Sequence, residues 1–206
     1  MSKLANDLMK KGYLKTDVII DAFYKISREE FVPRDLFGCA DLDIPLPIGY
    51  GQTISQPMTV AFMLELLDPK VGDNILDIGS GSGWVTALLA YIVGKKGKVT
   101  AIERIKELCE FGKNNIDKFD FIEKEIVEFY CADGSKGFLQ NAPYDRIIVS
   151  AASKEIPSAF KEQLAVGGKM VIPVRNSIWY LEKKGKDEFY KEEFSGFAFV
   201  PLIEKN

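Results

Sequence analysis

A short glycine-rich segment is the first feature of the sequence with the residue types and spacing to bind a ligand. Asp77 and Ile78 close an apolar run at residues 74–78, Gly79-Ser80-Gly81-Ser82-Gly83 follows, and a second apolar segment begins near Trp84. This pattern predicts a tight turn from a strand into a helix, whose bare backbone lets a ligand approach the helix N-terminus. In open parallel sheets, ligands bind at such carboxyl ends of strands.

Two further acids end the next two predicted strands. Glu103 closes residues 99–103, 24 residues after Gly79, and Asp133-Gly134 follows the strand at 126–131. A carboxylate at the first place can accept hydrogen bonds from both hydroxyls of a ribose, and the second can reach an adenine edge. Together with the acid before the glycine turn, these acids predict one nucleoside ligand.

Two absences narrow the chemistry. The usual G-x-G-x-x-G fingerprint of dinucleotide sites has its third glycine where this chain has Trp84, which disfavours a nicotinamide-dependent oxidoreductase. The chain also contains no histidine. His-ligated metal sites, Ser-His or Cys-His nucleophile pairs and histidine general bases are therefore excluded.

Apolar periodicity places these segments in an alternation of strands and helices. We expect strands at 74–78, 99–103, 126–131, 144–151 and 170–174, and helices at 57–67, 84–93, 105–117 and 158–166. Continuously apolar strands that alternate with helices predict a Rossmann-like, doubly wound α/β fold. In this fold a mostly parallel sheet carries helices on both faces.

The two ends of the chain differ from this core. Residues 1–56 hold a predicted helix capped by Thr16, a helical turn with a capping box that starts at Ser27, and a proline-rich loop at 44–51. Residues 176–206 are strand-rich, as expected of antiparallel strands at a sheet edge. We predict a single domain, 1–206, made of a helical cap with an active-site loop (1–56), a cofactor-binding core (57–175) and a C-terminal β extension (176–206).

Composition indicates a globular enzyme or binding domain. The 206 residues carry 27 Lys and Arg against 30 Asp and Glu, a net charge of -3, which disfavours a nucleic-acid-binding surface. Three cysteines without a C-x-x-C pair predict neither a disulfide framework nor a zinc cage. Signal-peptide and membrane-spanning patterns are lacking. We expect a cytoplasmic, metal-free monomer that binds neither nucleic acid nor membrane.

One seven-residue block is specific enough to suggest a family. Gly51-Gln52-Thr53-Ile54-Ser55-Gln56-Pro57 closely resembles a segment of the protein-L-isoaspartate O-methyltransferases, and the glycine turn resembles the cofactor loop of S-adenosylmethionine-dependent methyltransferases in general. Further similarities follow the family's order along nearly the whole chain, at residues 31–33, 46–49, 77–83, 103–105, 132–134, 142–145, 163–168 and 200–202.

The resemblance implies transfer of a methyl group from S-adenosylmethionine to the α-carboxylate of an L-isoaspartyl residue in a damaged polypeptide. The ester then closes to a succinimide, which partly reopens as normal aspartate. The resemblance implies Ser55 as the active-site residue and Ala151, Ala152 and Val200 as substrate-facing. It implies cofactor contacts at Gln52, Thr53, Ile54, Ser55, Asp77, Gly79, Ser80, Gly81, Gly83, Glu103, Asp133 and Gly134.

This chemistry agrees with a chain that has no histidine. A free carboxylate has a pKa of roughly 4 and is already ionised at neutral pH, so no general base is needed. Ser55 would orient the carboxylate rather than attack it. A purely structural role is also open, because Ser55 precedes a helix with Pro57 in its first turn and could cap that helix.

Four positions depart from the family pattern and bear on substrate choice. Val60 stands where some members have a histidine that contacts the cofactor, and Ser150 where a threonine or glycine is common. Ser153 replaces a third alanine, and Arg175 replaces a glycine. The alternatives are a methyltransferase of another substrate and, in a different class, a nucleoside-binding module without catalysis.

Overall fold

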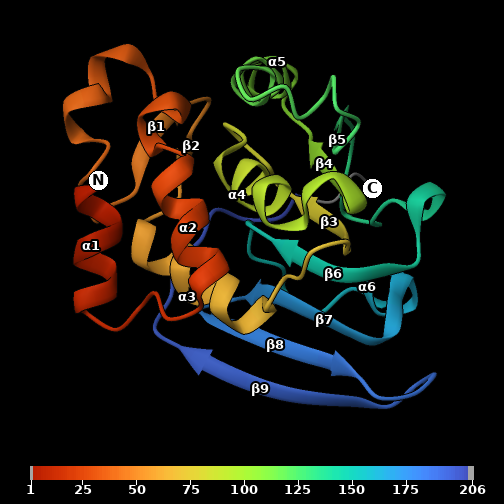
Figure 1. Cartoon of the computed structure of the whole chain (residues 1–206). Helices are drawn as coiled ribbons and strands as arrows, with labels where there is room; N and C mark the ends of the chain where they lie inside the picture. Colours follow the sequence, from red (N-terminus) through yellow and green to blue (C-terminus); the bar gives the residue numbers. More distant parts are fainter. Residues whose placement is uncertain (1, 204–206) are drawn as a thin grey trace.

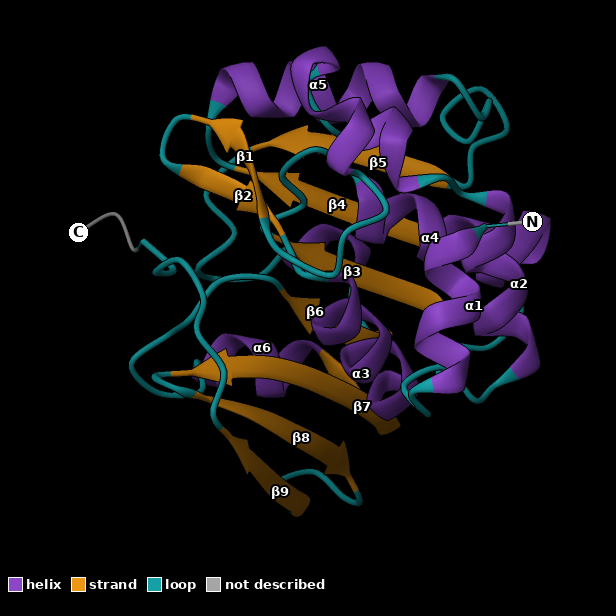
Figure 2. Ribbon diagram, turned by 90° about the vertical axis from the view of Figure 1, so that its left-hand side faces the viewer, coloured by secondary structure: helices purple, strands orange, loops and turns teal. Residues whose placement is uncertain are grey.

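A seven-stranded sheet organises the chain (Figures 1 and 2). The computed structural model describes residues 2–203 and orders the strands β5-β4-β3-β6-β7-β8-β9. The pairs β3–β4, β4–β5, β3–β6 and β6–β7 are parallel, whereas β8 and β9 add antiparallel at one edge. The strands are β3 (Asn74–Ile78), β4 (Lys98–Glu103), β5 (Val127–Cys131), β6 (Tyr144–Val149), β7 (Leu164–Val174), β8 (Ser177–Lys183) and β9 (Phe189–Ser195).

Helices cover both faces of this sheet, but unequally. The α-helices are α1 (Lys3–Lys10), α2 (Asp17–Lys25), α3 (Pro57–Leu67), α4 (Trp84–Val93), α5 (Lys106–Asp117) and α6 (Ser158–Gln163). The first five share one hydrophobic cluster, with α1 and α2 outside α3 and α4 (Figure 1), and α6 covers the other face. The predicted Rossmann-like fold, with its helical cap and antiparallel edge, is confirmed.

Short elements complete the fold and connect the cap to the sheet. A separate two-stranded antiparallel hairpin joins the cap to α3. It consists of β1 (Leu46–Gly49) and β2 (Gln52–Ile54), and the 3-10 helices are η1 (Arg28–Phe31), η2 (Arg34–Cys39), η3 (Gly94–Lys96) and η4 (Leu139–Asn141).

Side chains alternate between two cores along β3. Ile75 belongs to the cluster under α4, whereas Leu76 and Ile78 belong to the cluster that contains Phe160 of α6. The period of two places Asp77 on the same side as Ile75. Its carboxylate accordingly accepts a hydrogen bond from Thr86 of α4.

Three local predictions are wrong. The helix expected at 158–166 ends at Gln163, and β7 already begins at Leu164. Gly167, with a φ of 83°, lies where the pairing of β7 with β6 is irregular, so the glycine pair forms a kink inside this strand. Thr16 lies at the N-cap of α2, but its side chain does not cap the helix and Ser27 forms no capping box.

Candidate active site

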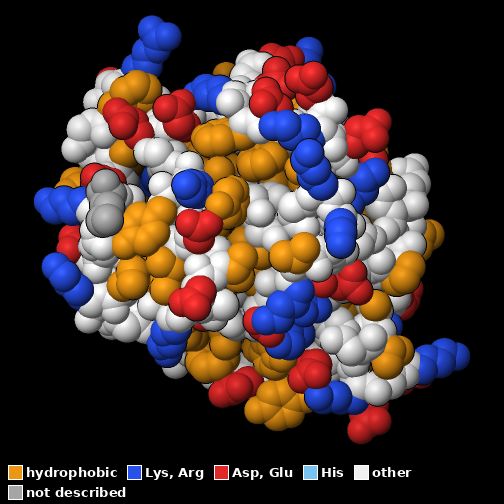
Figure 3. All heavy atoms as spheres, viewed as in Figure 1, with side chains coloured by type: hydrophobic (Ala, Val, Ile, Leu, Met, Phe, Trp, Pro, Cys, Tyr) orange, Lys and Arg blue, Asp and Glu red, His pale blue; other side chains and the backbone are white. Residues whose placement is uncertain are grey.

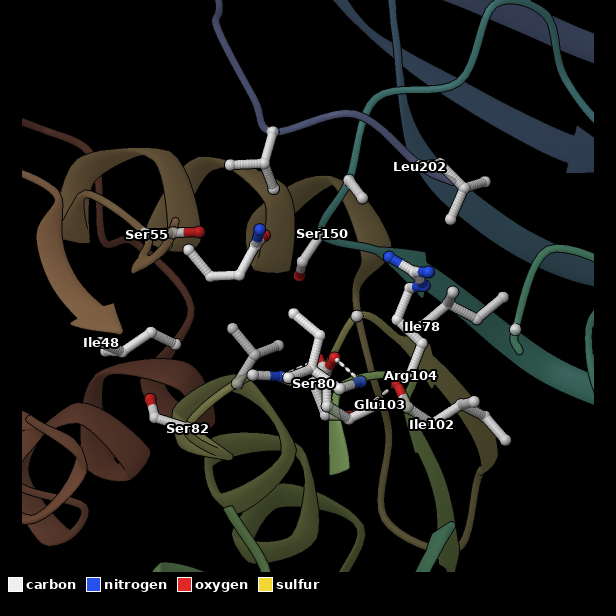
Figure 4. Close-up of a pocket in the computed structure, with 18 of the residues that line it drawn as sticks. Ile48, Ser55, Ile78, Ser80, Ser82, Ile102, Glu103, Arg104, Ser150 and Leu202 are labelled. Atoms are coloured by element: carbon white, nitrogen blue, oxygen red, sulfur yellow. Dashed lines mark hydrogen bonds between the residues drawn. The ribbon is translucent and has the colours of Figure 1, made fainter. Parts of the chain in front are cut away.

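The candidate site lies where the strand order reverses. β3 is flanked by β4 on one side and by β6 on the other, and ligands of open α/β sheets bind at such a switch point. The turn after β3 needs glycine, because Gly79, Gly81 and Gly83 have φ values of 78°, 54° and 90°. Beside this turn, the carboxyl ends of the strands open into a pocket (Figure 4).

Most of the residues predicted to hold a cofactor meet in this pocket. Ten of the twelve line it: Gln52, Thr53, Ile54, Ser55, Gly79, Ser80, Gly81, Glu103, Asp133 and Gly134. Asp77 and Gly83 are the two that do not. Among the predicted substrate-facing residues, Ala151 and Val200 line the pocket and Ala152 does not.

Glu103 is held rigidly at the end of β4. One carboxylate oxygen accepts the Gly81 N–H at 3.0 Å, and the other accepts the Ile105 N–H at 2.9 Å (dashed lines in Figure 4). The residue is only 5% exposed, and these two hydrogen bonds hold its carboxylate in place. Each oxygen still has a second lone pair, which makes this group a fixed acceptor for ligand hydroxyls.

Asp77 lies behind the glycine turn. Thr86 Oγ1 donates to one carboxylate oxygen at 2.6 Å, and the other oxygen has no partner within residues 2–203. Burial raises the pKa of Asp77 to about 7; the Thr86 hydrogen bond lowers it and the neighbouring Glu103 raises it. A contribution of Asp77 to ligand binding stays a prediction. Because Asp77 does not line the pocket, it would act indirectly, by holding the glycine turn and α4 in position.

Ser55 connects the hairpin to α3 and does not cap that helix. The N-cap position belongs to Gln56, and the Met58 N–H donates to Asp43 Oδ1 at 2.8 Å instead. The capping role considered for Ser55 is therefore wrong. Its hydroxyl points into the cavity, as does that of Ser150, opposite Glu103 (Figure 4).

The segment at 200–203 forms one wall of the pocket. It is attached to the loop after β6 by two backbone hydrogen bonds: Ala152 N–H donates to the Val200 carbonyl at 2.8 Å, and Leu202 N–H donates to the Ala152 carbonyl at 2.7 Å. Ala152 therefore fixes this wall without lining the cavity.

Several lining residues have no counterpart among the predicted contacts. Arg104 follows Glu103 at a strand end, so its position in sequence was a usable signal. Ile48 and Leu202 reach the pocket from opposite ends of the chain. Both lie in segments that resemble the family pattern, 46–49 and 200–202, but an aliphatic side chain carries no ligand-binding signal of its own.

Comparison with known proteins decides the family. The model of the protein-L-isoaspartate(D-aspartate) O-methyltransferase family matches residues 1–206. The chain belongs to this family. A protein-L-isoaspartate O-methyltransferase of Methanopyrus kandleri is 44% identical over 205 residues, with 98% of this chain and 90% of the relative covered. One of Methanococcus maripaludis is 44% identical over 202 residues, with 97% and 94% covered.

Solved structures of the family share the fold. A Plasmodium falciparum protein assigned to the family, crystallised with S-adenosyl-L-homocysteine, superposes with a TM-score of 0.88 at 25% identity, covering 99% of this chain and 98% of the other. Another protein-L-isoaspartate O-methyltransferase gives 0.87 at 30% identity, covering 98% and 65%. The resemblance inferred from the sequence is thus confirmed, and the oxidoreductase alternative loses its basis.

Most of the positions that depart from the family pattern lie away from the reacting groups. Val60 is buried in α3, and the Ser153 hydroxyl donates to the Pro173 carbonyl at 3.3 Å. Arg175 has a φ of 55°, a left-handed conformation that a glycine would adopt at no cost. Of these positions, Ser150 alone lines the pocket.

Outside the pocket, we searched the described residues for metal sites, reactive thiols and membrane-spanning helices. No group of three or more His, Cys, Asp or Glu within residues 2–203 could hold a metal ion. Burial raises the pKa of Cys109 to about 11, with Cys131 adding to the shift, so this thiol stays protonated. No helix in the same range is long and apolar enough to cross a membrane. Basic and acidic side chains are interspersed on the face in Figure 3.

Proposed function

We propose that this chain transfers the methyl group of S-adenosylmethionine to the α-carboxylate of L-isoaspartyl residues in damaged polypeptides. The observation that carries the proposal is one pocket that combines the glycine turn, the anchored Glu103 and the Ser55 hydroxyl, in a member of the family named for this reaction. The methyl ester then closes to a succinimide, which partly reopens as normal aspartate.

The donor side of the pocket fits a nucleoside. Glu103 presents two fixed oxygens to the ribose hydroxyls, and the backbone of Gly79 to Gly81 lets the ligand approach closely. Asp133 and Gly134 line the pocket at the end of β5, where we place the adenine edge. S-adenosylmethionine supplies an activated methyl group on a sulfonium.

The acceptor side lies toward Ser55. The Ser55 hydroxyl donates a hydrogen bond to the substrate carboxylate and orients one of its oxygens toward the methyl group, while Ala151 and Val200 face the peptide. The wall at 200–203 helps to exclude water from the reacting groups. No base is required, because an α-carboxylate with a pKa of roughly 4 is ionised at neutral pH.

The proposal includes the location, oligomeric state and partners of the enzyme. We place it in the cytoplasm as a metal-free monomer, with polypeptides as its partners and neither nucleic acid nor membrane. The net charge of -3 and the mixed charges in Figure 3 favour this assignment over a polyanion-binding surface.

The direct test compares an isoaspartyl peptide with its normal aspartyl twin, using radiolabelled S-adenosylmethionine. We expect label on the isoaspartyl form only. Donor binding without isoaspartyl turnover would favour a methyltransferase of another substrate, and donor binding without methylation of any peptide or extract would favour a non-catalytic module.

Ser55→Ala tests the role of the hydroxyl. A hydrogen bond to a charged group is worth about 1.5–3 kcal/mol, so we expect turnover to fall roughly 10- to 100-fold and donor affinity to fall less than turnover. Ser195→Ala, at the exposed end of β9, is the matched control. An equal loss of donor affinity in Ser55→Ala would contradict the assigned role.

A further inference from the structure

One buried arginine holds together the segments that surround Ser55. Arg28, the first residue of η1, is only 2% exposed, although arginine is rarely buried without a specific partner. Its guanidinium donates to five backbone carbonyls, those of Ala40, Leu42, Ile44, Ile54 and Ser55. Two separate stretches of chain, 40–44 and 54–55, therefore converge on a single side chain.

One nitrogen of the guanidinium contacts both stretches of chain. Nη2 lies 2.9 Å from the Ile44 carbonyl and 3.0 Å from the Ser55 carbonyl, so one nitrogen bridges the two stretches. The planar guanidinium offers five donors in a rigid fork, which suits several fixed acceptors. The side chain also lies over Trp84, with Cζ 5.3 Å from the ring centroid, and Trp84 lines the pocket.

The position of Ser55 depends on this arrangement. Before Ser55, the hairpin pairs Ile54 with Leu46. After it, Asp43 accepts the Met58 N–H, and the Arg28 bonds to the Leu42 and Ile44 carbonyls hold Asp43 in place from both sides. The Ser55 carbonyl itself is bound by Arg28, which restricts the backbone that carries the hydroxyl.

We propose that Arg28 is a positioning residue for methyl transfer, holding the 40–44 and 54–55 segments together so that the Ser55 hydroxyl faces the substrate carboxylate. The inference rests on the proposed function and adds to it a residue that does not line the pocket. The charge persists at this buried place: desolvation lowers the pKa of Arg28 to about 10, partly offset by Asp43 and Asp41, so the guanidinium remains protonated at neutral pH.

The test replaces Arg28 with lysine, which keeps the charge but cannot bridge two carbonyl-bearing segments with a planar fork. Arg146→Lys is the matched control, because Arg146 also donates to backbone carbonyls, those of Asp68 and Asp145, at the opposite end of the sheet. Steady-state rates with the isoaspartyl peptide, calorimetric affinity for S-adenosylhomocysteine and the thermal midpoint are measured for both variants and the wild type.

We expect Arg28→Lys to lower kcat by up to roughly 100-fold, the cost of displacing a positioned group by about 1 Å. Affinity for S-adenosylhomocysteine falls less than kcat, because the hydrogen bonds of Arg28 go to residues 40–44 and 54–55 and not to Glu103 or the glycine turn. Arg146→Lys lowers the thermal midpoint and retains kcat. Hydrogen exchange, followed on the folded protein, shows faster exchange of the Met58 amide in Arg28→Lys.

Several results would overturn the inference. The inference is wrong if Arg28→Lys keeps the wild-type kcat. It is also wrong if Arg146→Lys, with the same thermal midpoint as Arg28→Lys, loses as much kcat. An equal loss of S-adenosylhomocysteine affinity, or unchanged exchange at Met58, also rejects it. If the wild type does not methylate the isoaspartyl peptide, the proposed function fails and the inference fails with it. If the wild type is active, the Arg28→Lys results test the inference alone.

Discussion

Asp77→Asn measures the cost of burying a carboxyl group behind the glycine turn. Asp77 is fully buried, and burial is the main reason why its pKa rises from 3.8 to about 7. Each tenfold change in proton affinity corresponds to about 1.4 kcal/mol. The ionised side chain therefore destabilises the folded protein by about 4 kcal/mol relative to the unfolded chain.

The sign follows from the direction of the change in pKa. Because the pKa is higher in the folded state, folding takes up a proton between the two values. The stability that protonated Asp77 provides is complete below about pH 4 and is lost as the pH rises through about 7. Asparagine cannot ionise, yet its carbonyl can still accept the Thr86 hydrogen bond. We expect Asp77→Asn to exceed the wild type in stability by up to about 4 kcal/mol above neutral pH and to approach it in acid.

The assay is urea unfolding of the ligand-free protein at several values between about pH 4 and about pH 8, with the variant compared with the wild type at each pH. The comparison is needed because carboxylates whose pKa is lowered, such as those of Asp68 and Glu128, shift the absolute stability in the opposite direction. Asp187→Asn, at an exposed position, is the control. A difference between Asp77→Asn and wild type that stays constant with pH would refute the reasoning.

Two further substitutions probe the donor side of the pocket. Glu103→Gln removes the charge and turns an amide NH2 toward the N–H of either Gly81 or Ile105. We expect the affinity for S-adenosylhomocysteine, measured by calorimetry, to fall roughly 100-fold. An unchanged affinity would contradict the assignment of Glu103 to the ribose hydroxyls. Gly112→Ala places a Cβ 2.6 Å from the Gly81 carbonyl oxygen, so the turn or α5 must move and donor affinity should fall. Gly38→Ala, whose Cβ meets no atom within 4 Å, is its control, and equal affinities in the two variants would count against the crowding argument.

Local patterns predicted which residues would come together around the glycine turn. The glycine turn and Glu103 lie within a strand-turn-helix-strand sequence, where each element shows its own hydrophobic period and the acid ends a strand. The parallel sheet then brings neighbouring strand ends together without further information. Asp77 shows the limit of spacing alone, because the period of two along β3 turns it toward α4 rather than toward the pocket.

Contacts between residues far apart in the sequence could not be predicted from local patterns. Arg28 binds backbone carbonyls 12 to 27 residues away, and every residue type has a carbonyl, so no side-chain pattern marks the partners. Asp43 replaces Ser55 as the capping group for a similar reason, since a distant loop supplies it. The helix predicted at 158–166 ends early for a similar reason, because pairing with β6 incorporates the chain from Leu164 onward into a strand.

The wall at residues 200–203 has a consequence for the order in which the working pocket is assembled. Synthesis proceeds from the N-terminus, so the ribosome releases this wall after every other part of the pocket lining. A nascent chain that has passed Asp133 already contains the turn and the acids expected to hold the donor. The sheet needs β6 beside β3 to complete the switch point, and the wall at 200–203 is attached to the loop after β6, so that wall can close the pocket only after β6 has paired with β3.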